Sequence, residues 1–433
     1  VKTEFAFGAV KEKILFDYCS NGLRWTIFDK GMDITAIGRQ LRFNCDLKRG
    51  MDLNSNFNLI QSSYPVDACS FNLDGFDTDK SKQCTLVGNR GFWRSDYMVY
   101  LKGNNYMMSV KTHGEYVKKI ESINSENLKG AFLNDGVSLI QSNGKEYRNI
   151  EPLWNWTMLP GTTCDTTIDP GSPNTFKTNN QSQFVGQVSD GTSGISAMDY
   201  NRSTVRAHKS YFFTDNLMVA LGSGIGSANA KNLVTTINQR FLNHHKVYTS
   251  TSRFKTNRWI WHDSIAYIFP GNQTPIVRTE WRTGEWNKVD MVSKTATAKD
   301  SILSIFLPQS NNDSYAYIVK PACPLEGITK ITEQKDMKIL SNTPDVQAIQ
   351  SKSLVMAVFY NSSLLKVPNG EMIRVNHPCI LLYKHDDKKR EVWISDPTRK
   401  LATIQILIDG KSHDITLPSG DYAGSTLKTF FPE

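Results

Sequence analysis

Hydrophobic residues recur at helix-like intervals only near the amino end of the sequence. Between Phe5 and Phe28 they fall mostly three to five positions apart, and Asn21-Gly22 interrupts the pattern. This spacing predicts two short amphipathic helices. Two such helices cannot bury their own apolar faces, so we expect them to pack on the rest of the chain or on helical material outside it.

Periodicity is weak between Gly31 and Cys84. The run from Ile34 to Ile37 predicts a short strand, and the remainder predicts loops rich in Asn, Asp and Ser. Long irregular connections tend to be functional or to join domains.

Alternation of apolar and polar residues begins after Cys84 and continues along the chain. Strands are predicted at 97–101, 106–111, 211–213, 217–221, 247–249, 265–269, 302–306 and 315–319, and then at 354–359, 379–383, 392–394, 404–408 and 414–417. Turn residues such as Asp409-Gly410 separate these strands, and no long helical pattern interrupts them. The fold class is therefore mainly β, with a large antiparallel domain of sandwich type and a smaller sandwich after it.

Composition narrows the class of protein. A length of 433 residues suggests two or three domains, and 39% apolar residues are enough to form their cores. No run of about 18 apolar residues could span a bilayer, so we expect no membrane partner. The net charge of +8 favours a polyanion, but it is dispersed, and the basic run ending at Arg390 is more typical of a hairpin tip than of a nucleic-acid site.

The cysteines and the amino terminus exclude few further kinds of site or location. The seven cysteines show no C-x-x-C motif, which argues against a zinc site and a disulfide scaffold and leaves one or two disulfides open. Val1-Lys2-Thr3-Glu4 does not resemble a signal peptide. A start without Met is typical of a trimmed product or a fragment, so this terminus does not indicate location.

Most candidate motifs favour structural interpretations. Strands flank the glycine-rich run from Gly222 to Gly226 on both sides, so we expect a tight bend there and not a nucleotide site. The eight histidines suggest neither a metal site nor a triad. Arg94 lies between aromatic residues, where it either serves a sugar-binding platform or pairs with Asp96, and we favour the pair.

Two stretches carry unusual charge patterns. Arg39 and Arg42 lie three positions apart and repel each other unless a structural or ligand carboxylate lies between them; two solvated surface cations are an equally favoured alternative. The run from Tyr116 to Gly136 predicts a loop and contains Glu121 and Asn124.

Ordered motifs across nearly the whole chain resemble the polysaccharide lyases of family 8, the chondroitin AC, hyaluronan and xanthan lyases, and most closely the chondroitin AC type. The motifs are Asn89-Arg90-x-Phe92-Trp93-Arg94-Ser95-Asp96-Tyr97, Glu121-Ser122-x-Asn124-x-Glu126-Asn127-x-x-Gly130, Leu133-x-Asp135-Gly136, Tyr147-x-Asn149-Ile150-x-Pro152-x-Trp154-x-Trp156, Leu159-Pro160-Gly161-Thr162-Thr163, Val188-Ser189-Asp190-Gly191, Ala207-His208-Lys209-Ser210-Tyr211-Phe212-Phe213, Thr235-Thr236-Ile237-Asn238-Gln239 and Leu340-Ser341-Asn342-Thr343-Pro344. The resemblance implies the end of a helical toroid and a connector at 1–84, a β supersandwich at 85–336 and a C-terminal β-sandwich at 337–433. Most of the toroid is missing from the chain.

The same resemblance implies β-elimination at a uronic acid, in which an Asn neutralises the sugar carboxylate while Tyr and His act as base and acid. These three residues come from the toroid and are not found here. Arg39 and Glu121 match catalytic-site residues of the family, with Glu121 holding Arg39 in place, and Arg42 and Asn124 match substrate-binding positions. The family arginines are four positions apart and these are three apart, which weakens the match of Arg42.

Some chondroitin lyases bind calcium near the Trp-x-Trp segment. Here Asn155 and Thr157 stand where acids would be, and only Asp165 is near in the sequence, so we expect no metal and no cofactor.

The sequence therefore predicts an extracellular or periplasmic lyase of chondroitin- or hyaluronan-type polysaccharides, represented by its β part. Its expected partners are the acidic polysaccharide and the missing toroid segment, encoded upstream or present as a separate associated chain, without nucleic acid. The isolated chain should be inactive. The alternative is a carbohydrate-binding β protein without catalysis, whose Trp-rich segments stack on sugar.

Overall fold

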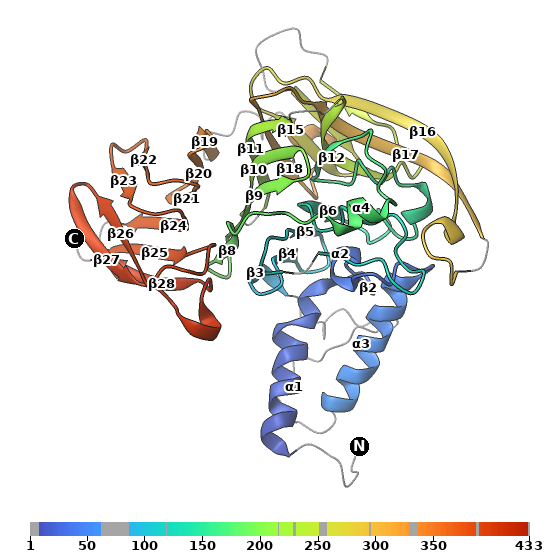
Figure 1. Cartoon of the computed structure of the whole chain (residues 1–433), viewed down its shortest axis with the longest axis horizontal. Coiled ribbons are helices and arrows are strands. Elements are labelled where there is room, and N and C mark those ends of the chain that lie inside the picture. Colours follow the sequence, from blue (N-terminus) through green and yellow to red (C-terminus); the bar gives the residue numbers. More distant parts are fainter. Residues whose placement is uncertain are drawn as a thin grey trace.

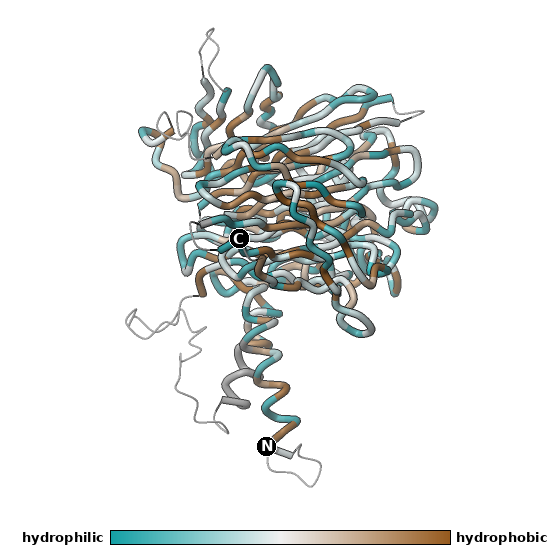
Figure 2. Tube along the Cα trace, turned by 90° about the vertical axis from the view of Figure 1, so that its left-hand side faces the viewer, coloured by the Kyte–Doolittle hydropathy of each residue, from teal (hydrophilic) through white to brown (hydrophobic). Residues whose placement is uncertain are grey.

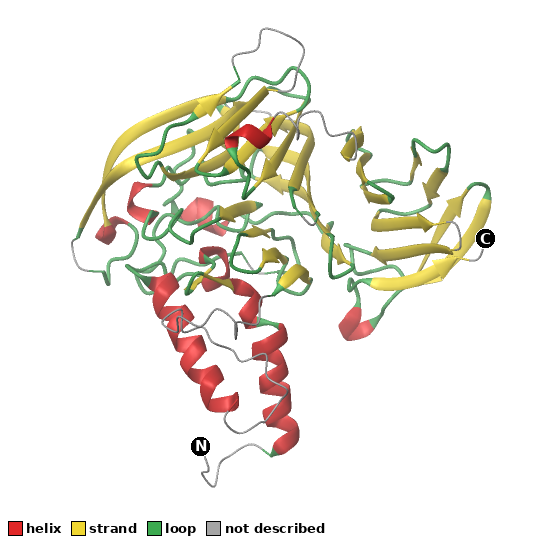
Figure 3. Cartoon of the chain, turned by 180° about the vertical axis from the view of Figure 1, so that it is seen from behind, coloured by secondary structure: helices red, strands yellow, loops and turns green. Residues whose placement is uncertain are grey.

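The computed structural model describes residues 8–61, 86–117, 119–214, 216–227, 231–250, 258–293, 296–328, 337–386 and 389–431. Two helices extend from one end of a large β body, and a second β unit lies at its side (Figure 1). The same view from behind shows how far the helices are segregated from the strands (Figure 3). The mainly β fold class is confirmed, with antiparallel pairing throughout the described ladders.

The amino-terminal part contains more helix than the sequence pattern predicted. Its elements are α1 (Ala9–Asn21), η1 (Leu23–Thr26), β1 (Ile27–Phe28), β2 (Gly31–Met32), α2 (Ile34–Ile37) and α3 (Cys45–Gln61). The two helices predicted before Phe28 correspond to α1 and the single turn η1.

The prediction of a strand at Ile34 to Ile37 and of loops after it was wrong. Asp33 caps α2 by accepting a hydrogen bond from the Thr35 backbone nitrogen at 2.8 Å, which starts a helical turn in a β-branched run. Helix α3 lies in the stretch predicted as loop, and its first half leaves Lys48, Arg49 and Met51 exposed. Because this helix is polar, its sequence shows no apolar stripe from which a helix could be predicted. Residues 62–85, with Cys69 and Cys84, lie outside the described part.

Helix α1 keeps an apolar face uncovered. Val10, Ile14 and Tyr18 are 76%, 61% and 59% exposed. In Figure 2 the helix stands clear of the β body with hydrophobic segments on its surface. Among the described helices, none is long and apolar enough to cross a membrane.

Three sheets form the central β body within the described residues. The first contains β3 (Val87–Phe92), β4 (Tyr97–Lys102), β5 (Met107–Lys111) and β6 (Val137–Gln141). The second has the order β13-β14-β15-β18-β11-β10-β9-β8, with bounds Tyr248–Thr249, Arg258–His262, Ile265–Phe269, Asp313–Lys320, Met218–Ser227, Val205–Phe213, Gly194–Arg202 and Val185–Ser189. The third has the order β16-β17-β12-β7, with bounds Ile276–Glu285, Thr297–Pro308, Leu233–Phe241 and Thr163–Asp165. Short helical segments α4 (Pro173–Lys177), η3 (Glu151–Leu153), η4 (Trp286–Lys288) and η5 (Leu325–Gly327) lie in the connections.

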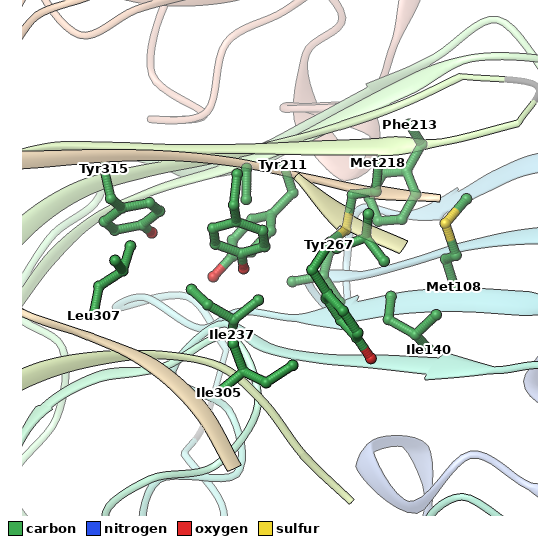
Figure 4. Close-up of a cluster of buried hydrophobic side chains, with 14 of the residues drawn as sticks. Met108, Ile140, Tyr211, Phe213, Met218, Ile237, Tyr267, Ile305, Leu307 and Tyr315 are labelled. Atoms are coloured by element: carbon green, nitrogen blue, oxygen red, sulfur yellow. The ribbon is translucent and has the colours of Figure 1, made fainter. Parts of the chain in front are cut away.

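One apolar core joins these three sheets. Met108 comes from β5, Tyr211 from β10, Ile305 from β17 and Tyr315 from β18, and all are fully or almost fully buried (Figure 4). Each sheet therefore buries one face against the others, as a sandwich requires.

The glycine-rich run from Gly222 to Gly226, where the sequence predicted a tight bend, forms a bulge inside β11. The register with β18 shifts between Gly222 and Ile225, and Gly224 has a φ of +60°. Gly222 is required because a Cβ there would lie 2.1 Å from the Tyr315 ring.

The C-terminal unit is a sandwich of two sheets. One has the order β19-β20-β21-β24-β25-β28, with bounds Met337–Asn342, Val346–Ser351, Leu354–Phe359, Cys379–Asp386, Lys389–Ser395 and Leu427–Phe431. The other has the order β22-β23-β26-β27, with bounds Ser363–Lys366, Met372–Val375, Thr403–Ile408 and Lys411–Thr416, and η6 (Gly420–Tyr422) precedes β28. All five strands predicted here are present.

A second apolar cluster, which we call the shared cluster, joins the two β units. Val219 and Ile268 of the eight-stranded sheet belong to it together with Ile349, Met356 and Trp393 of the C-terminal unit. The two units therefore contact each other through buried apolar side chains, as in the core of a single domain.

Five cysteines of the described residues are free thiols, namely Cys19, Cys45, Cys164, Cys323 and Cys379.

Replacing Glu151 with Gln should stabilise the protein at alkaline pH. Glu151 is 1% exposed, and burial, helped by the Asp46 charge, raises its pKa from 4.5 to about 8. Between these values the folded state binds more protons than the unfolded state, so the unfolding free energy of the native protein falls as pH rises from about 4.5 to about 8. Glu151→Gln removes this dependence, and we expect it to be more stable than the native protein above pH 8 by on the order of 2–4 kcal/mol. Urea unfolding at pH 5 and pH 8.5 measures the effect. An equal difference at both pH values would contradict the assignment.

Candidate functional site

Asp33 fixes the segment that carries the two arginines. Its carboxylate is 1% exposed and accepts hydrogen bonds from the Thr35 hydroxyl at 2.7 Å, from the Tyr97 hydroxyl at 3.1 Å and from the Ser109 hydroxyl. These bonds tie the start of α2 to β4 and β5. The helix ends at Gly38, whose φ of +82° lies in the region that favours glycine, and Arg39 follows directly.

Arg39 and Arg42 are held by three carboxylates. Arg39 Nη1 lies 3.1 Å from Glu121 Oε2, and Arg39 Nε lies 3.0 Å from Glu126 Oε2. Arg42 Nη2 contacts the second oxygen of Glu126, and Arg42 Nε lies 2.9 Å from Asp290 Oδ2. Glu126 is therefore a bridge between the two guanidinium groups. The structure brings Glu121 to Arg39 as the sequence suggested, and the arginines are not two solvated cations.

The acidic loop has the backbone of an ordered turn, as predicted. Asn124, Ser125 and Asn127 have φ values of +56°, +62° and +53°. The buried Asn127 side chain donates to the Glu121 carbonyl at 3.0 Å and accepts from the Gly130 nitrogen at 2.9 Å. The backbone of the turn that carries Glu121 and Glu126 is thus fixed by its own hydrogen bonds.

The connection after β16 positions Asp290 beside the acidic loop. The Leu128 nitrogen donates to the Val289 carbonyl at 2.8 Å, and the Met291 nitrogen donates to the Ser125 carbonyl at 3.0 Å. Asp290 is fully buried beside Glu126. Sequence reasoning missed both partners: Glu126 lies in the acid-rich run that was singled out, whereas Asp290 is an isolated acid 248 positions from Arg42 and carries no local signal.

Asn124 lies apart from this network. It is exposed in the turn of the loop and is not among the described residues that line the pocket. The structure therefore places three of the four sequence-predicted residues, Arg39, Arg42 and Glu121, in one cluster and leaves Asn124 at its edge.

A pocket of about 700 Å³ opens between the helical end and the β body. Its walls come from the end of α1, η1, α2, the segment after Gly38, the end of β3, the start of β4, the end of β5, and the stretch before Glu121. Four cations line it, namely Arg39, Arg49, Lys111 and Lys119, whereas Glu121 is the acid in the described lining. Such a surface suits an anionic ligand.

The predicted pair between Arg94 and Asp96 was wrong. Asp96 is buried with a φ of +48° and points inward, where Arg399 Nη2 lies 3.2 Å from its Oδ1 atom. Burial raises the pKa of Asp96 to about 7, against the charges of Arg399 and Lys111. Arg94 points outward, and its Nη2 lies 3.6 Å from Asp421 Oδ1. Both residues thus contact the C-terminal unit.

The side-chain oxygens near the Trp-x-Trp segment accept hydrogen bonds from neighbouring residues of the chain. Asn155 Oδ1 accepts hydrogen bonds from the Thr157 backbone nitrogen and hydroxyl, and Asp165 Oδ1 accepts the equivalent pair from Thr167. Within the residues that the structure describes, no group of three or more His, Cys, Asp or Glu side chains could hold a metal ion.

Comparisons with known proteins agree with this architecture. The model of the polysaccharide lyase family 8 super-sandwich domain matches residues 87–331, and the model of the family 8 C-terminal β-sandwich domain matches residues 338–405. Chondroitinase-AC of Pedobacter heparinus is 33% identical over 363 residues, which are 78% of this chain and 51% of that protein. Hyaluronate lyase of Staphylococcus aureus is 26% identical over 339 residues, or 73% of this chain and 41% of that protein.

Solved structures extend the comparison to the helical end. A chondroitinase AC lyase structure described with oligosaccharide complexes aligns with a TM-score of 0.88 and 27% identity, covering 99% of this chain and 67% of that one. A Paenibacillus xanthan lyase aligns with a TM-score of 0.87 and 19% identity, covering 99% of this chain and 48% of that one, which shows the shared fold. The chain spans about half the length of the curated relatives that it matches, or less.

Proposed function

Because this chain belongs to polysaccharide lyase family 8, we propose that it is the β part of an enzyme that cleaves an acidic, uronic-acid-containing polysaccharide of the chondroitin or hyaluronan type by β-elimination. The observation that carries the proposal is the arginine pair, held by Glu121, Glu126 and Asp290, of which Arg39 and Glu121 line the cation-rich pocket. The names of the relatives support a lyase over a carbohydrate-binding protein without catalysis.

The chemistry explains why a fixed guanidinium is useful. Removing the proton next to a uronate carboxylate places charge on a group that is already negative, so the site must offset that charge and hold a base in place. Arg39 is held at two of its nitrogens by Glu121 and Glu126, so its charge keeps one position through the reaction. We assign Arg39 and Glu121 to orienting the proton-transferring groups.

Arg42 and Asn124 are assigned to the sugar. The Arg42 side chain is 42% exposed although Glu126 and Asp290 hold it, so part of its guanidinium faces solvent. Asn124 is exposed on the same loop as Glu121 and Glu126. An amide there can donate to and accept from sugar hydroxyls.

The Asn that neutralises the sugar carboxylate and the proton-transferring His and Tyr are assigned to helices that pack on α1, in a longer form of the chain or in an associated one. The exposed apolar face of α1 supports this, because Val10, Ile14 and Tyr18 need a covering partner. We propose that residues 1–84 form the end of the toroid and the connector, residues 85–336 the supersandwich and residues 337–433 the C-terminal sandwich. An extracellular or periplasmic location follows from the size of a polysaccharide substrate.

A lyase assay tests the proposal. The 433-residue chain, incubated with chondroitin or hyaluronan, should give no rise in the ultraviolet absorbance of unsaturated uronate, and adding the helical segment encoded upstream should restore turnover. Robust turnover by the chain alone would contradict the assignment of proton transfer to those helices. Intact binding of the polymer without turnover by the assembled protein would favour the carbohydrate-binding alternative.

A further inference from the structure

The arginine pair carries no excess positive charge that could attract the anion of a bound sugar. Arg39 and Arg42 face Glu121, Glu126 and Asp290, so two positive charges meet three negative ones. Guanidinium groups that are already paired gain less from a further carboxylate than an unpaired cation does. A cation elsewhere in the pocket is therefore better suited to pair with that anion.

Lys119 differs from the other cations of the pocket. Lys111 Nζ donates to the Ser95 carbonyl and lies near Asp96. Arg49 is exposed on α3. The Lys119 side chain is half-buried, no acid within the described residues pairs with it, and the charge that acts on it is that of Arg202. Burial and this second cation both lower the pKa of Lys119.

The backbone around Lys119 is fixed against a turn of the β body. Ile120 is 8% exposed and packs in the cluster that contains Phe132 and Leu133. Arg202 Nη1 donates to the Ala131 carbonyl at 2.8 Å, which places the second cation beside the same turn. Asn134 follows Leu133 in this turn and lines the pocket together with Lys119 and Glu121. Lys119 is therefore held at one wall of the pocket.

We propose that Lys119, with the side-chain amide of Asn134, binds the anionic group of an acidic sugar in this pocket. Asp135 neutralises Arg202 at 2.6 Å, whereas Lys119 has no acidic partner among the described residues, so a carboxylate or sulfate in the pocket would supply the counter-ion that Lys119 lacks. The amide of Asn134 can donate a hydrogen bond to the same group. The inference rests on the proposed function for the identity of the ligand, and not for the existence of the anion site.

Binding measurements on the 433-residue chain test the proposal. The probes are a hyaluronan tetrasaccharide, which carries only carboxylates, and a chondroitin sulfate tetrasaccharide. Lys119→Gln should weaken binding about ten-fold or more, as expected for loss of a charged hydrogen bond, and should reduce the salt dependence of binding. Lys119→Arg should retain most of the affinity. Lys384→Gln, which removes an exposed lysine of β24, is the matched control and should leave affinity unchanged.

The pKa of Lys119, followed by NMR of its ε-carbon, provides a second measurement. If the role of Lys119 were purely structural, this pKa would not change when a ligand is added. It should rise when either tetrasaccharide binds, and a larger rise with one of them identifies carboxylate or sulfate as the preferred group. Equal affinity of Lys119→Gln and the native chain would overturn the inference. If neither tetrasaccharide binds the native chain, inorganic sulfate tests the anion site independently of the proposed function: a shift of the Lys119 signal supports the site, and no shift overturns it.

Discussion

An Asp135→Ala variant is expected to lose about 3–5 kcal/mol of unfolding free energy, the range for removing one partner of a buried ion pair. Asp135 is 1% exposed, and its Oδ2 atom accepts from Arg202 Nη1 at 2.6 Å and from the Tyr200 hydroxyl at 2.7 Å. His113 Nδ1 lies 3.3 Å from its other oxygen. The substitution leaves the Arg202 charge buried without a counter-ion.

Urea unfolding of a double variant separates charge from packing. Asp135→Ala with Arg202→Met removes both charges, so it should lose less stability than Asp135→Ala alone. Asp169→Ala, at an acid whose contacts are exposed, is the control and should change the unfolding free energy by less than about 1 kcal/mol. A loss for Asp135→Ala no larger than that of the control would refute the assignment of a buried ion pair.

A Glu126→Ala variant is expected to lower kcat of an assembled enzyme by about 100-fold, because a small displacement of a positioned group costs that much. Glu126 is buried and holds both arginines, whereas the Glu121 side chain is 60% exposed and holds only Arg39. Glu121→Ala should therefore also lower kcat, by releasing one contact of Arg39, but to a smaller extent.

Steady-state kinetics of the two variants test whether the arginines orient the proton-transferring groups or bind the substrate. Glu126→Ala should act mainly on kcat if the arginines orient the proton-transferring groups, and mainly on KM if they bind substrate. The Nε–H signals of Arg39 and Arg42 in NMR spectra of the chain provide a readout without substrate: Glu126→Ala should shift both, and Glu121→Ala only that of Arg39. An unchanged kcat in Glu126→Ala would remove the role assigned to the pair.

Sequence reasoning worked where one side of a strand is buried and the other is not. The alternation in the run 404–408 located a strand because its burial alternates with the pleat. It failed at α2, where a single capping residue, Asp33, overrides the strand preference of Ile34 and Thr35. It also failed at α3, whose sequence is too polar to show a helical stripe.

The candidate site could be predicted only in part, since its contacts join distant segments. Arg39 and Glu121 are 82 positions apart, and their association came from a family resemblance and not from spacing. Asp290 reaches Arg42 only because hydrogen bonds align the connection after β16 with the acidic loop. A register of this kind is set by tertiary pairing, and no local pattern encodes it.

The shared cluster restricts how such chains can be recombined during evolution. Ile349, Met356 and Trp393 are packed against Val219 and Ile268 of the other unit, so neither sandwich has a complete surface without its neighbour. A crossover that joined a foreign C-terminal sandwich near position 337 would place unmatched side chains at a core-like junction, at a cost typical of core substitutions. The two units are therefore expected to be inherited as a pair, with matched changes on both sides of the junction.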